Sequence, residues 1–574
     1  MATWIKCNFL TLKKMRKTIC FTIILVLFSS CEDYFEHTPQ GNPTDEKFYQ
    51  NLNELQIGLN AVYSILADNN FQKSEWLFGD GCGDDCTLTD GVNPSSHLGQ
   101  VGLFTFSSDN DMIRTRWQIN YTGIFRANWI ILNAPGTYQW PGLGGANQNV
   151  LREIICQAKF LRALFYFNLV KTYGGVPIKP EKLEITADGT DNFVQPRSSL
   201  TEVYQYIEKD LRESILGLRE SYIEEEFGHI TKGAATGLLI KVLAYQGKPG
   251  IQHPKWDEVV SMGSAFINQE NMSIRELLDF DNLYPDESPE EIAERLGFRN
   301  SLNLDSLIMV AGKYNLSTAY DELWNLSGEF SESSLIEVNH VNTPNIDRNF
   351  GSWFSEELNS RNYPHADIIQ PSQNLLDLKG SSNDPRLFTT VLEQPGFVPD
   401  NTSIGGQAGP TYTSCYKWYT LRYERQLQAG NPKNFRMLRF ADIILYYAEA
   451  LNETGDPVAA IDEANKLRYR ARQIAVSGRW TAIPSGPDDI PYGNYLQVRD
   501  RIWKERRIEK ACEFDRFWDI VRTGQAAERL AEFNQKMGLD RYKKHFVKGV
   551  NEIFPIPQVE IDLSNGIVTQ NPGY

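Results

Sequence analysis

The chain has 574 residues and carries 73 acidic against 57 basic side chains, a formal net charge of −16 at pH 7. This balance opposes nucleic acid as a partner, because binding a phosphate backbone requires a basic face. It also disfavours broad contact with anionic lipid headgroups, but not local binding of a small anion. The length is enough for one very large core or for two closely packed halves.

Residues 1–30 are predicted to be an export signal. Met15-Arg16-Lys17 supplies a basic start, and Thr18 to Phe28 forms an apolar run that is too short to span a bilayer. Because this pattern begins cleanly at Met15, we take Met15 as the true start. The run ends Leu27-Phe28-Ser29-Ser30-Cys31, which resembles a bacterial lipoprotein cleavage site. We therefore predict that Cys31 is diacylated and anchors the mature chain to a membrane face.

Two helices are predicted in the next part of the chain. Thr44 to Lys47 can cap a helix whose apolar positions, from Phe48 to Leu66, recur every three and four residues. A second helix is predicted from Asp111 to Asn133. Between them, Asn69 to Asp109 is rich in Gly, Asp, Asn, Ser and Thr without a sustained period, and is predicted to be a long functional or mobile loop.

The segment from Cys156 to Tyr173 is predicted to be the central helix of the fold. Apolar and aromatic residues fall on nearly every side of a helical wheel, which is typical of a helix buried among other helices. Gly174-Gly175 and Pro177 are expected to end it. Arg162 interrupts the apolar pattern, and a buried arginine requires a carboxylate partner, so we interpret it as structural.

The remaining helices follow a repeat pattern. Two segments have a similar pattern: Ala244-Tyr-Gln-Gly247, which precedes Trp256, and Tyr447 to Pro457, which precedes an amphipathic helix from Ala459 to Arg472. Small residues at a helix contact, a turn with glycine and a second amphipathic helix are typical of tetratricopeptide-like hairpins. The two units are far apart, so a large insertion, from about residue 275 to 435, is expected to split the repeats.

The insertion and the C-terminal block differ in character. In the insertion, Ser334 to Asn339 alternates like a short strand, and the surrounding stretches are turn-rich and aromatic. Tyr495 to Thr523 is predicted to be helical, with opposite charges three and four residues apart among Trp and Phe, as in a packed ion-pair network. The chain ends in an apolar, proline-containing stretch that is expected to dock as a strap.

The cysteines do not form a disulfide framework. Cys82-Gly-Asp-Asp-Cys86 has the look of a metal or redox motif, but no second Cys or His pair stands at zinc spacing. We predict neither a metal nor a cofactor.

Five motifs, taken in order, resemble the SusD/RagB family. They are the Cys31-Glu-Asp-Tyr-Phe start, Ala163 to Pro177, Phe440 to Glu453, Glu505 to Asp519, and the ending from Phe554 to Tyr574. The resemblance covers residues 31 to 574. It implies a mostly α fold, with a tetratricopeptide-repeat helical frame and a loop-rich insertion that carries short strands. We expect one domain with a helical part (31–275), a ligand-facing insertion (276–435) and a helical C-terminal part with a docking strap (436–574).

The resemblance also implies location and partners. Family members are outer-membrane lipoproteins of the Bacteroidetes type that face outward. They sit as a lid over a SusC-like TonB-dependent transporter and help capture oligosaccharides, or sometimes peptides, for import. The alternatives are a peptide-binding lid and a surface adhesin without a transport role.

Candidate ligand residues follow from the positions at which the family places its binding groups. A sugar presents an apolar face and hydroxyl rims, so its site needs exposed aromatic rings flanked by polar side chains. The matching positions are Asp84, Asp85, His97 and Phe104 in the first loop, and Trp353 and Tyr363 in the insertion. For Asp84 and Asp85 a turn-forming role is the alternative, and for Trp353 a packing anchor.

An enzymatic role is the remaining alternative. Glu505 and Glu509 could be imagined as the carboxylate pair of a glycoside hydrolase, but they lie one turn apart on one helix with arginines between them. Neighbouring arginines lower carboxylate pKa values and so remove the proton donor that such chemistry requires. We predict that the protein is not an enzyme.

Overall fold

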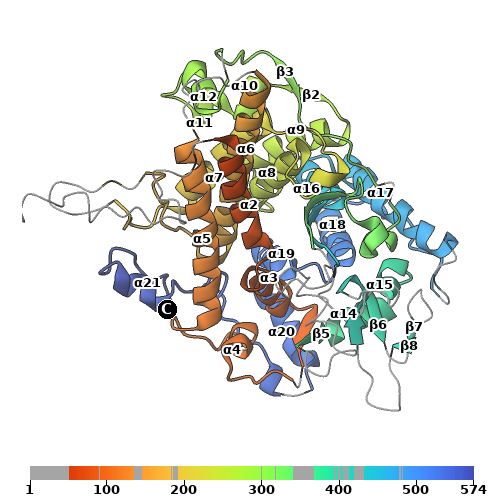
Figure 1. Cartoon of the computed structure of the whole chain (residues 1–574). Helices are drawn as coiled ribbons and strands as arrows, with labels where there is room; N and C mark the ends of the chain where they lie inside the picture. The colour runs from red at the N-terminus through yellow and green to blue at the C-terminus, as the bar shows by residue number, and fades with distance from the viewer. Residues whose placement is uncertain are drawn as a thin grey trace, which may run out of the picture. The chain divides into compact units, whose positions relative to one another are not determined.

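The fold is organised around α6 (Gly145–Tyr173), which lies among other helices in the computed structural model of the chain (Figure 1). Every side chain from residue 153 to 170 is buried, and the helix ends at Gly174, whose φ of +73° closes the last turn. This confirms the predicted central helix and its C-terminus. The structure describes residues 49, 51–89, 91–134, 145–182, 184, 192–298, 300–316, 318–340, 368–393, 396–397, 403–404, 413–418, 432–477, 480, 483–538 and 540–574.

Arg162 of α6 is an ion-pair partner inside the frame, as predicted. Its Nε atom donates to Asp210 Oδ2 at 2.7 Å and its Nη1 atom to Glu181 Oε1 at 2.6 Å. Asn128 Oδ1 accepts another of its N–H groups at 2.8 Å. The buried charge is therefore compensated on several sides, which is the condition for its burial.

The helices on either side of α6 form one continuous series in which each helix packs against the next (Figure 1). The middle insertion separates α9 from α16 in sequence, yet these two helices pack together. The fold is therefore a mostly α, tetratricopeptide-like frame, and its repeats are split by an insertion. The helices of the series are α5 (Asp111–Asn133), α6, α7 (Leu200–Gly217), α8 (Lys232–Gln246), α9 (Pro254–Ile267), α16 (Phe440–Glu453), α17 (Pro457–Val476) and α18 (Tyr495–Lys510).

The small residues of the two repeat blocks allow this close packing. A Cβ atom added at Gly247 would lie 2.5 Å from the Trp256 ring, and one added at Gly263 would lie 2.7 Å from the Tyr447 ring. Any larger side chain at these positions would displace a neighbouring helix. The helix starts are set locally, for example by the capping box in which Ser199 and Glu202 satisfy each other's backbone N–H groups.

The first segment is more ordered than the sequence suggested. The predicted loop from Asn69 to Asp109 contains α3 (Asn69–Trp76), a π-helical turn η1 (Leu77–Gly81), β1 (Cys86–Leu88) and α4 (His97–Leu103). It follows α2 (Leu52–Ala67). The polar residues that indicated a loop are largely helix caps: Asp68, Ser96 and Asn110 each accept a hydrogen bond from a backbone N–H of the following helix.

Short helices and antiparallel strand pairs make up the insertion and its borders, and the pair of β1 with β5 joins it to the first segment. The other pairs are β2 with β3, β4 with β10, β6 with β9 and β7 with β8. Strand β4 (Ser334–Val338) matches the predicted strand, and its partner β10 (Phe435–Arg439) leads directly into α16. The remaining strands are β2 (Asn271–Ser273), β3 (Leu307–Met309), β5 (Ile369–Pro371), β6 (Val391–Glu393), β7 (Gly396–Phe397), β8 (Ser403–Ile404) and β9 (Thr413–Cys415).

Short helices complete the insertion and the C-terminal part. In the insertion they are α10 (Ile274–Leu278), α11 (Phe280–Leu283), α12 (Pro289–Arg295), η3 (Glu322–Trp324), η4 (Leu326–Gly328), α14 (Gln373–Gly380), α15 (Pro385–Thr390) and η7 (Tyr416–Trp418). In the C-terminal part they are α19 (Arg516–Arg522), α20 (Ala526–Lys536), η8 (Asp540–Tyr542) and α21 (Gln558–Leu563). Among the described residues, no helix combines the length and the apolarity that crossing a membrane requires.

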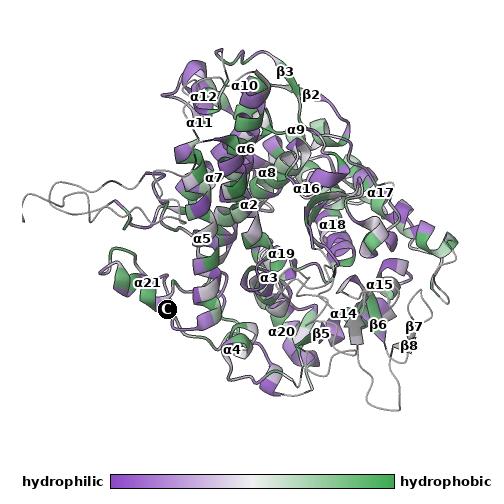
Figure 2. Ribbon diagram, in the orientation of Figure 1, coloured by the Kyte–Doolittle hydropathy of each residue, from purple (hydrophilic) through white to green (hydrophobic). Residues whose placement is uncertain are grey.

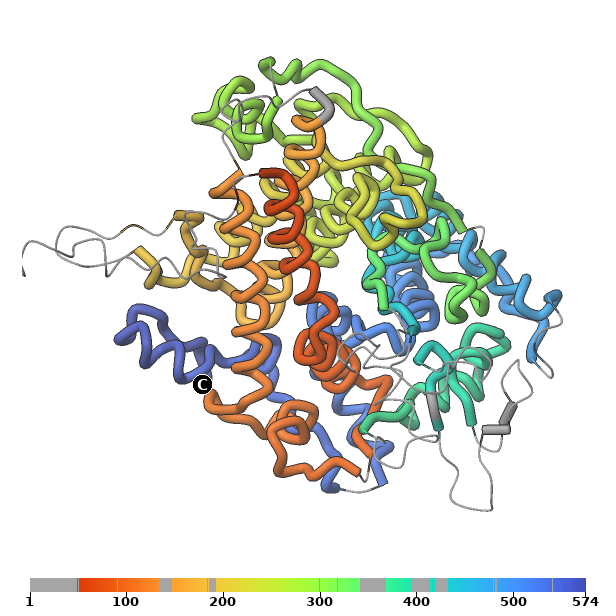
Figure 3. Tube along the Cα trace, in the orientation of Figure 1, coloured from red at the N-terminus to blue at the C-terminus, as the bar shows by residue number. Residues whose placement is uncertain are grey.

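The C-terminal end docks on the frame as predicted. Phe554 and Ile556 are fully buried, and the Phe554 N–H donates to Thr172 O, near the end of α6, at 2.7 Å. Asn571 Nδ2 donates to Tyr173 O at 3.0 Å, and Arg197 donates to Asn571 Oδ1 at 2.6 Å. Segments that are distant in sequence therefore meet here, and the trace shows the first and last parts of the chain side by side around α3 and α19 (Figure 3).

Candidate functional site

A hollow with a volume of about 620 Å³ opens among the residues that the structure describes. It lies where the α2–α3 junction, the connection before α8 and strand β4 come together, that is, between the first segment and the insertion. Its volume falls within the range typical of ligand-binding clefts. The residues that line it are 60, 63, 64, 66–70, 227–230 and 336–339.

One side of the hollow combines an aromatic ring with amide side chains. Phe227 is 40% exposed, and its ring lies 5.3 Å from that of Phe330, which supports it from behind. Asn69 and Asn70 at the start of α3 and Asn339 after β4 are exposed around it. An exposed ring beside amide donors and acceptors is the surface that a sugar, with its apolar face and hydroxyl rim, requires.

Another part of the lining, His229 and Tyr63, belongs to an aromatic cluster held by hydrogen bonds. The His229 ring lies between those of Tyr63 and Tyr222, with centroid distances of 5.7 and 5.4 Å. The Tyr63 hydroxyl donates to Gln157 Oε1 at 2.6 Å and accepts from the Ile230 N–H at 3.0 Å. Burial lowers the pKa of His229 below its usual 6.5, so the imidazole is neutral at pH 7. This wall is therefore rigid and uncharged at its rings.

The strand that floors the hollow is fixed by buried polar contacts. Next to β4, the His340 N–H donates to Asn434 Oδ1 at 2.7 Å, and its Nε2 atom lies 2.7 Å from Gln72 Nε2. On β4, Glu337 accepts from Asn434 Nδ2 at 3.0 Å and from the Phe330 N–H at 3.0 Å. The hollow thus has a preformed floor, and a preformed site lowers the entropic cost of binding.

The two predicted aspartates lie elsewhere, in the core. Asp84 and Asp85 have no exposed surface. Arg516 Nε donates to Asp84 Oδ1 at 2.7 Å, and Arg507 Nε donates to Asp85 Oδ1 at 2.7 Å. The arginines hold the pKa of Asp84 well below its usual value, although burial opposes them. A ligand cannot reach these carboxylates, so we correct their predicted role: they tie the first segment to the C-terminal helices.

Phe104 also has a packing role instead of the predicted ligand-binding one. It is 7% exposed and has a left-handed backbone conformation (φ +59°, ψ +40°) at the end of α4. Its ring lies 5.3 Å from that of Phe546 and 5.6 Å from that of Phe517, inside an aromatic cluster that also contains Phe554. The left-handed backbone directs the ring inward.

His97 is the predicted residue of the first segment that remains accessible. It begins α4, its side chain is 48% exposed, and its Nδ1 atom lies 2.9 Å from Asp111 Oδ2. It does not line the hollow. Trp353, Tyr363 and the lipid-site residue Cys31 lie outside the described residues, so their roles stay predictions.

Three other tryptophans that the structure describes are buried. Trp76, Trp324 and Trp418 are 0%, 4% and 3% exposed, which assigns them to packing. The hollow instead uses Phe227 and His229, which sequence reasoning missed. A signal was present, because Phe227 follows the acidic run Glu224-Glu225-Glu226 in a polar connection where an apolar core position is not expected.

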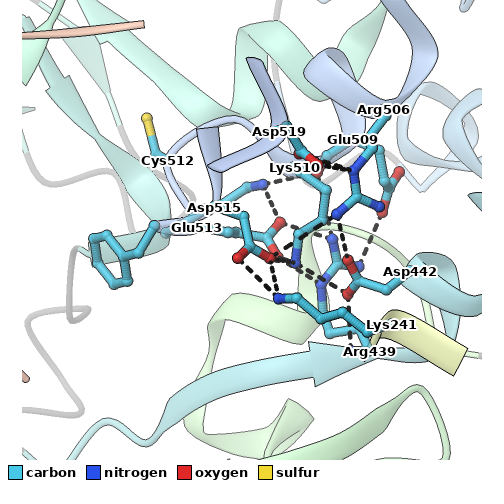
Figure 4. A network of polar contacts seen from close by, with 12 residues as sticks. Lys241, Arg439, Asp442, Arg506, Glu509, Lys510, Cys512, Glu513, Asp515 and Asp519 are labelled. Carbon is cyan, nitrogen blue, oxygen red and sulfur yellow. Dashed lines mark hydrogen bonds and ion pairs between the residues drawn. The ribbon is translucent and has the colours of Figure 1, made fainter. Parts of the chain in front are cut away.

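The carboxylates considered for catalysis belong to a buried ion-pair network (Figure 4). Glu509 contacts Arg439 and Arg386, both at 2.9 Å, and also Arg470. Although burial opposes them, these cations hold the pKa of Glu509 well below its usual value, so it cannot donate a proton at neutral pH. Helix α18, which carries it, is hydrophilic along much of its length (Figure 2) although Glu505, Arg506 and Glu509 are buried.

The network continues toward α16 and α19. Lys510 Nζ lies 3.0 Å from Asp442 Oδ2 and 2.8 Å from Glu513 Oε2, and Lys241 Nζ lies 2.9 Å from Asp515 Oδ1. In Figure 4 the charged side chains point toward one another from α8, β10, α16, α18 and α19 and from the turn after α18, whereas the thiol of Cys512 points away from them. This confirms the packed ion-pair network that the sequence predicted.

Two family models match this chain. The model of the SusD family matches residues 396–574, and a model described as starch-binding associating with outer membrane matches residues 33–243. Similar relatives include SusD-like protein P38 of Formosa agariphila, which is 23% identical over 91% of this chain and 94% of its own length. A SusD-like protein of Bacteroides ovatus is 23% identical over 88% of this chain and 82% of its own length.

Solved structures of the same fold are also found. A laminarin-binding SusD-like protein is 25% identical, with a TM-score of 0.63 over 91% of this chain and 100% of its own. Surface glycan-binding protein A from Bacteroides thetaiotaomicron is 17% identical, with a TM-score of 0.64 over 92% of this chain and 100% of its own. The second likeness concerns the fold alone.

Proposed function

Because this chain belongs to the SusD/RagB family, we propose that it is an outer-membrane lipoprotein that binds an oligosaccharide outside the cell and delivers it to a SusC-like TonB-dependent transporter. Binding without turnover is part of the proposal. The lipid on Cys31 would hold the protein at the membrane, and the hollow would hold the glycan. The insertion residues Trp353 and Tyr363 remain proposed as additional ligand contacts.

The observation that carries the proposal is the hollow between Asp68–Asn70 and β4. It places the 40% exposed ring of Phe227 beside the amides of Asn69, Asn70 and Asn339 over a fixed floor. A ring that faces solvent in a concave, polar-rimmed site is typical of sugar recognition. The similar solved protein that is described as binding laminarin points to the same class of ligand.

The binding experiment uses the mature chain from residue 32. Isothermal titration with a panel of neutral gluco-, manno- and xylo-oligosaccharides and of acidic oligosaccharides should give binding to at least one of them. Phe227→Ala and Trp353→Ala are each expected to weaken that binding without lowering the thermal midpoint. Binding of peptides and of no oligosaccharide would favour the peptide-binding alternative.

Turnover, partner and anchoring have separate tests. Chromatography of the bound oligosaccharide after prolonged incubation should show no product, and shortened sugars would favour an enzyme. Detergent extracts of the native membrane should yield a large β-barrel together with this protein. If the protein purifies alone while still binding glycan, the adhesin alternative is favoured. Cys31→Ser should release the protein into the soluble fraction, and retention on the membrane would contradict the anchor.

A further inference from the structure

A small cavity lies beside the strand pair that floors the hollow. Its volume is about 30 Å³, which is more than the roughly 10–15 Å³ that one water molecule needs. Arg436 of β10 lines this cavity and pairs across the β4–β10 ladder with Glu337, which lines the hollow. Segments η3 and η7, strand β10 and the turn after α18 meet here. The residues that line the cavity are 324, 417, 418, 433–436 and 512–514.

Two buried residues of the lining carry donors that have no hydrogen-bond partner among the described residues. The donors are Nε and Nη2 of Arg436 and Nε1 of Trp324, and each residue is 4% exposed. Arg436 Nη2 lies 3.4 Å from Glu337 Oε1 in an ion pair without a hydrogen bond, and that oxygen already accepts from Asn434 Nδ2 at 3.0 Å. A buried donor that has left water and finds no acceptor destabilises the fold.

These donors serve one space, because the Arg436 guanidinium lies 5.7 Å from the centre of the Trp324 ring. Among the described side chains that line the cavity, the buried polar atoms without a hydrogen bond are all donors. The cavity therefore lacks an acceptor at this point. A water molecule could accept from one or two of them, but it brings no charge to balance the guanidinium.

Positive charge exceeds negative charge around the cavity. Lys417, Lys433 and Arg436 line it together with one carboxylate, that of Glu513. Although burial opposes them, Arg439 and Lys417 hold the pKa of Glu513 well below its usual value, and Arg439 Nη2 lies 2.7 Å from Glu513 Oε1. The negative charge of Glu513 is thus balanced inside the ion-pair network. The cavity side of the network remains cationic, and a buried cation requires compensation.

Aromatic rings set the size of the cavity. The Trp418 ring stacks on that of Phe514 with a centroid distance of 5.9 Å, and the Phe435 ring lies 5.5 Å from the same ring. Trp418 is held in place because its Nε1 atom donates to Cys512 O at 2.9 Å. Rings that are fixed in this way leave room for a small ion without its hydration shell, and exclude a large or strongly hydrated one.

We propose that this cavity is a binding site for a monovalent anion of halide size, and that chloride occupies it outside the cell. Nε and Nη2 of Arg436 and Nε1 of Trp324 donate to the ion, and the neighbouring lysines add positive charge. The ion replaces the missing acceptor and compensates the buried guanidinium. It also links η3 and η7 of the insertion to β10 and to the turn after α18, so that its binding stabilises the attachment of the insertion.

The direct test is the crystal structure of the natural mature chain from crystals grown in sodium bromide. Bromide is a halide that scatters anomalously, so it can be told apart from water. We expect an anomalous peak in the cavity, within hydrogen-bonding distance of Arg436 and Trp324 Nε1. A cavity that holds only water, or one that a side chain of this protein fills, would overturn the proposal.

The second test measures thermal unfolding of the mature chain while sodium chloride replaces sodium gluconate at constant ionic strength. Gluconate is too large for the cavity, and constant ionic strength keeps the screening of surface charges unchanged. An ion that binds the folded state alone should raise the thermal midpoint by about 1 °C for each tenfold increase in chloride. Bromide should act in the same way. A midpoint that does not depend on the halide would contradict the site.

Variants connect this salt effect to the cavity. Trp324→Phe removes one N–H donor and keeps a ring, and Arg436→Met removes the guanidinium and keeps an apolar chain of similar length. Both should abolish the dependence on chloride. Arg529→Met removes an arginine that pairs with Glu532 at the surface, so it should keep the full dependence. Equal loss in all three variants would show a general salt effect and overturn the proposal. The bromide structure decides the question if a cavity variant does not fold, and none of these measurements depends on glycan binding.

Discussion

The hollow and the ion-pair network use polar side chains in opposite ways. In the network, the charges of Glu509, Arg439 and Asp442 are buried, and partners of opposite charge surround them. In the hollow, the polar groups of Asn69 and Asn339 face solvent beside an exposed ring. Polar groups that are already satisfied inside the protein cannot serve a ligand. The density of charge therefore marks the part that holds the frame, and the exposed amides mark the part that is proposed to bind the glycan.

The two regions are connected through the β4–β10 pair. Ile336 and Val338 of β4 line the hollow, and β10 pairs with this strand in antiparallel register. Arg439 ends β10, where its N–H donates to Asp442 Oδ2 at 2.9 Å and its guanidinium contacts Glu509 and Glu513. The network thus fixes the strand that floors the hollow. Mutations in the network should therefore change mainly the stability of the protein, and mutations in the hollow should change mainly glycan binding.

The largest expected effect is on the stability of the network side. Glu509→Gln removes the negative charge that Arg386, Arg439 and Arg470 share. Arg386 keeps Asp384 and Glu505, and Arg439 keeps Glu513, but Arg470 loses its ion pair with Glu509 while it stays buried. Breaking a buried ion pair in this way costs about 3–5 kcal/mol. Urea unfolding at pH 7 should show this loss, and glycan affinity measured well below the transition should change less than twofold.

A matched exposed pair is the control for this variant. Glu532 lies 3.1 Å from Arg529 with both side chains partly exposed, so Glu532→Gln should change the free energy of unfolding by less than about 1 kcal/mol. Equal losses for the two variants would mean that burial does not distinguish the network from a surface pair.

A smaller effect, a gain in the free energy of unfolding instead of a loss, is expected when Asp80 is replaced. This fully buried carboxyl accepts the Phe514 N–H at 3.1 Å, and its Oδ1 atom has no hydrogen-bond partner. Burial raises its pKa from 3.8 to about 7, so the folded state binds this proton more tightly than the unfolded state does. Its ionisation therefore destabilises the fold increasingly as the pH rises from about 4 to about 7, and fully above that.

Asp80→Asn should remove this pH-dependent cost. We expect the variant to be about 2–4 kcal/mol more stable than the natural chain at pH 8, with a smaller difference at pH 5. Urea unfolding at the two pH values measures it. A stability gain that does not grow with pH would contradict the raised pKa. The neighbouring Asp84, which Arg516 neutralises at 2.7 Å, is the contrasting position, because Asp84→Asn should destabilise the protein.

The sequence predicted the frame better than the site, and the reason is physical. The helix from Asp111 to Asn133 was predicted to the residue and the end of α6 at Tyr173 to within about two residues, because periodicity and glycine signals are local. The segment from Asn69 to Asp109 was mispredicted because its polar residues cap short helices whose stability depends on tertiary burial. Local composition does not reveal such burial.

Asp84 illustrates the limit for site residues. In sequence it is a polar turn residue, and its partner Arg516 lies far along the chain, so neither its burial nor its pairing can be read locally. Phe227 illustrates the opposite error, because an apolar residue is expected to be buried and this one is 40% exposed. For Asp84 the decisive fact is a contact with a residue far along the chain. For Phe227 it is that no part of the chain covers the outer face of its ring.

On the binding side, the expected effect of one ring is moderate. Phe227→Ala removes the exposed platform and should weaken binding of the best oligosaccharide from the panel about tenfold, equivalent to about 1.4 kcal/mol. Because Phe227 contributes little to the core, the thermal midpoint should change by less than about two degrees. Ile223→Ala is the control, since Ile223 is 64% exposed in the same connection and does not line the hollow. Equal losses of affinity for both variants would place the glycan elsewhere.

The smallest expected effect is the change of glycan affinity with pH, which depends on the charge of His229. Burial lowers the pKa of His229 below 6.5, whereas Glu226 and Glu153 oppose this and Arg219 adds to it. The neutral imidazole between Tyr63 and Tyr222 therefore keeps its charge state as the pH falls from 8 to 6.5, and glycan affinity should vary less than twofold over this range. His229→Gln, which cannot titrate, provides the comparison. Glu329, whose pKa burial raises to about 7, lies outside the hollow and would affect both proteins equally. A change in affinity centred near pH 6.5 in the natural chain and missing in His229→Gln would show that this wall becomes charged, and the contrast between a neutral binding wall and a charged interior would then fail.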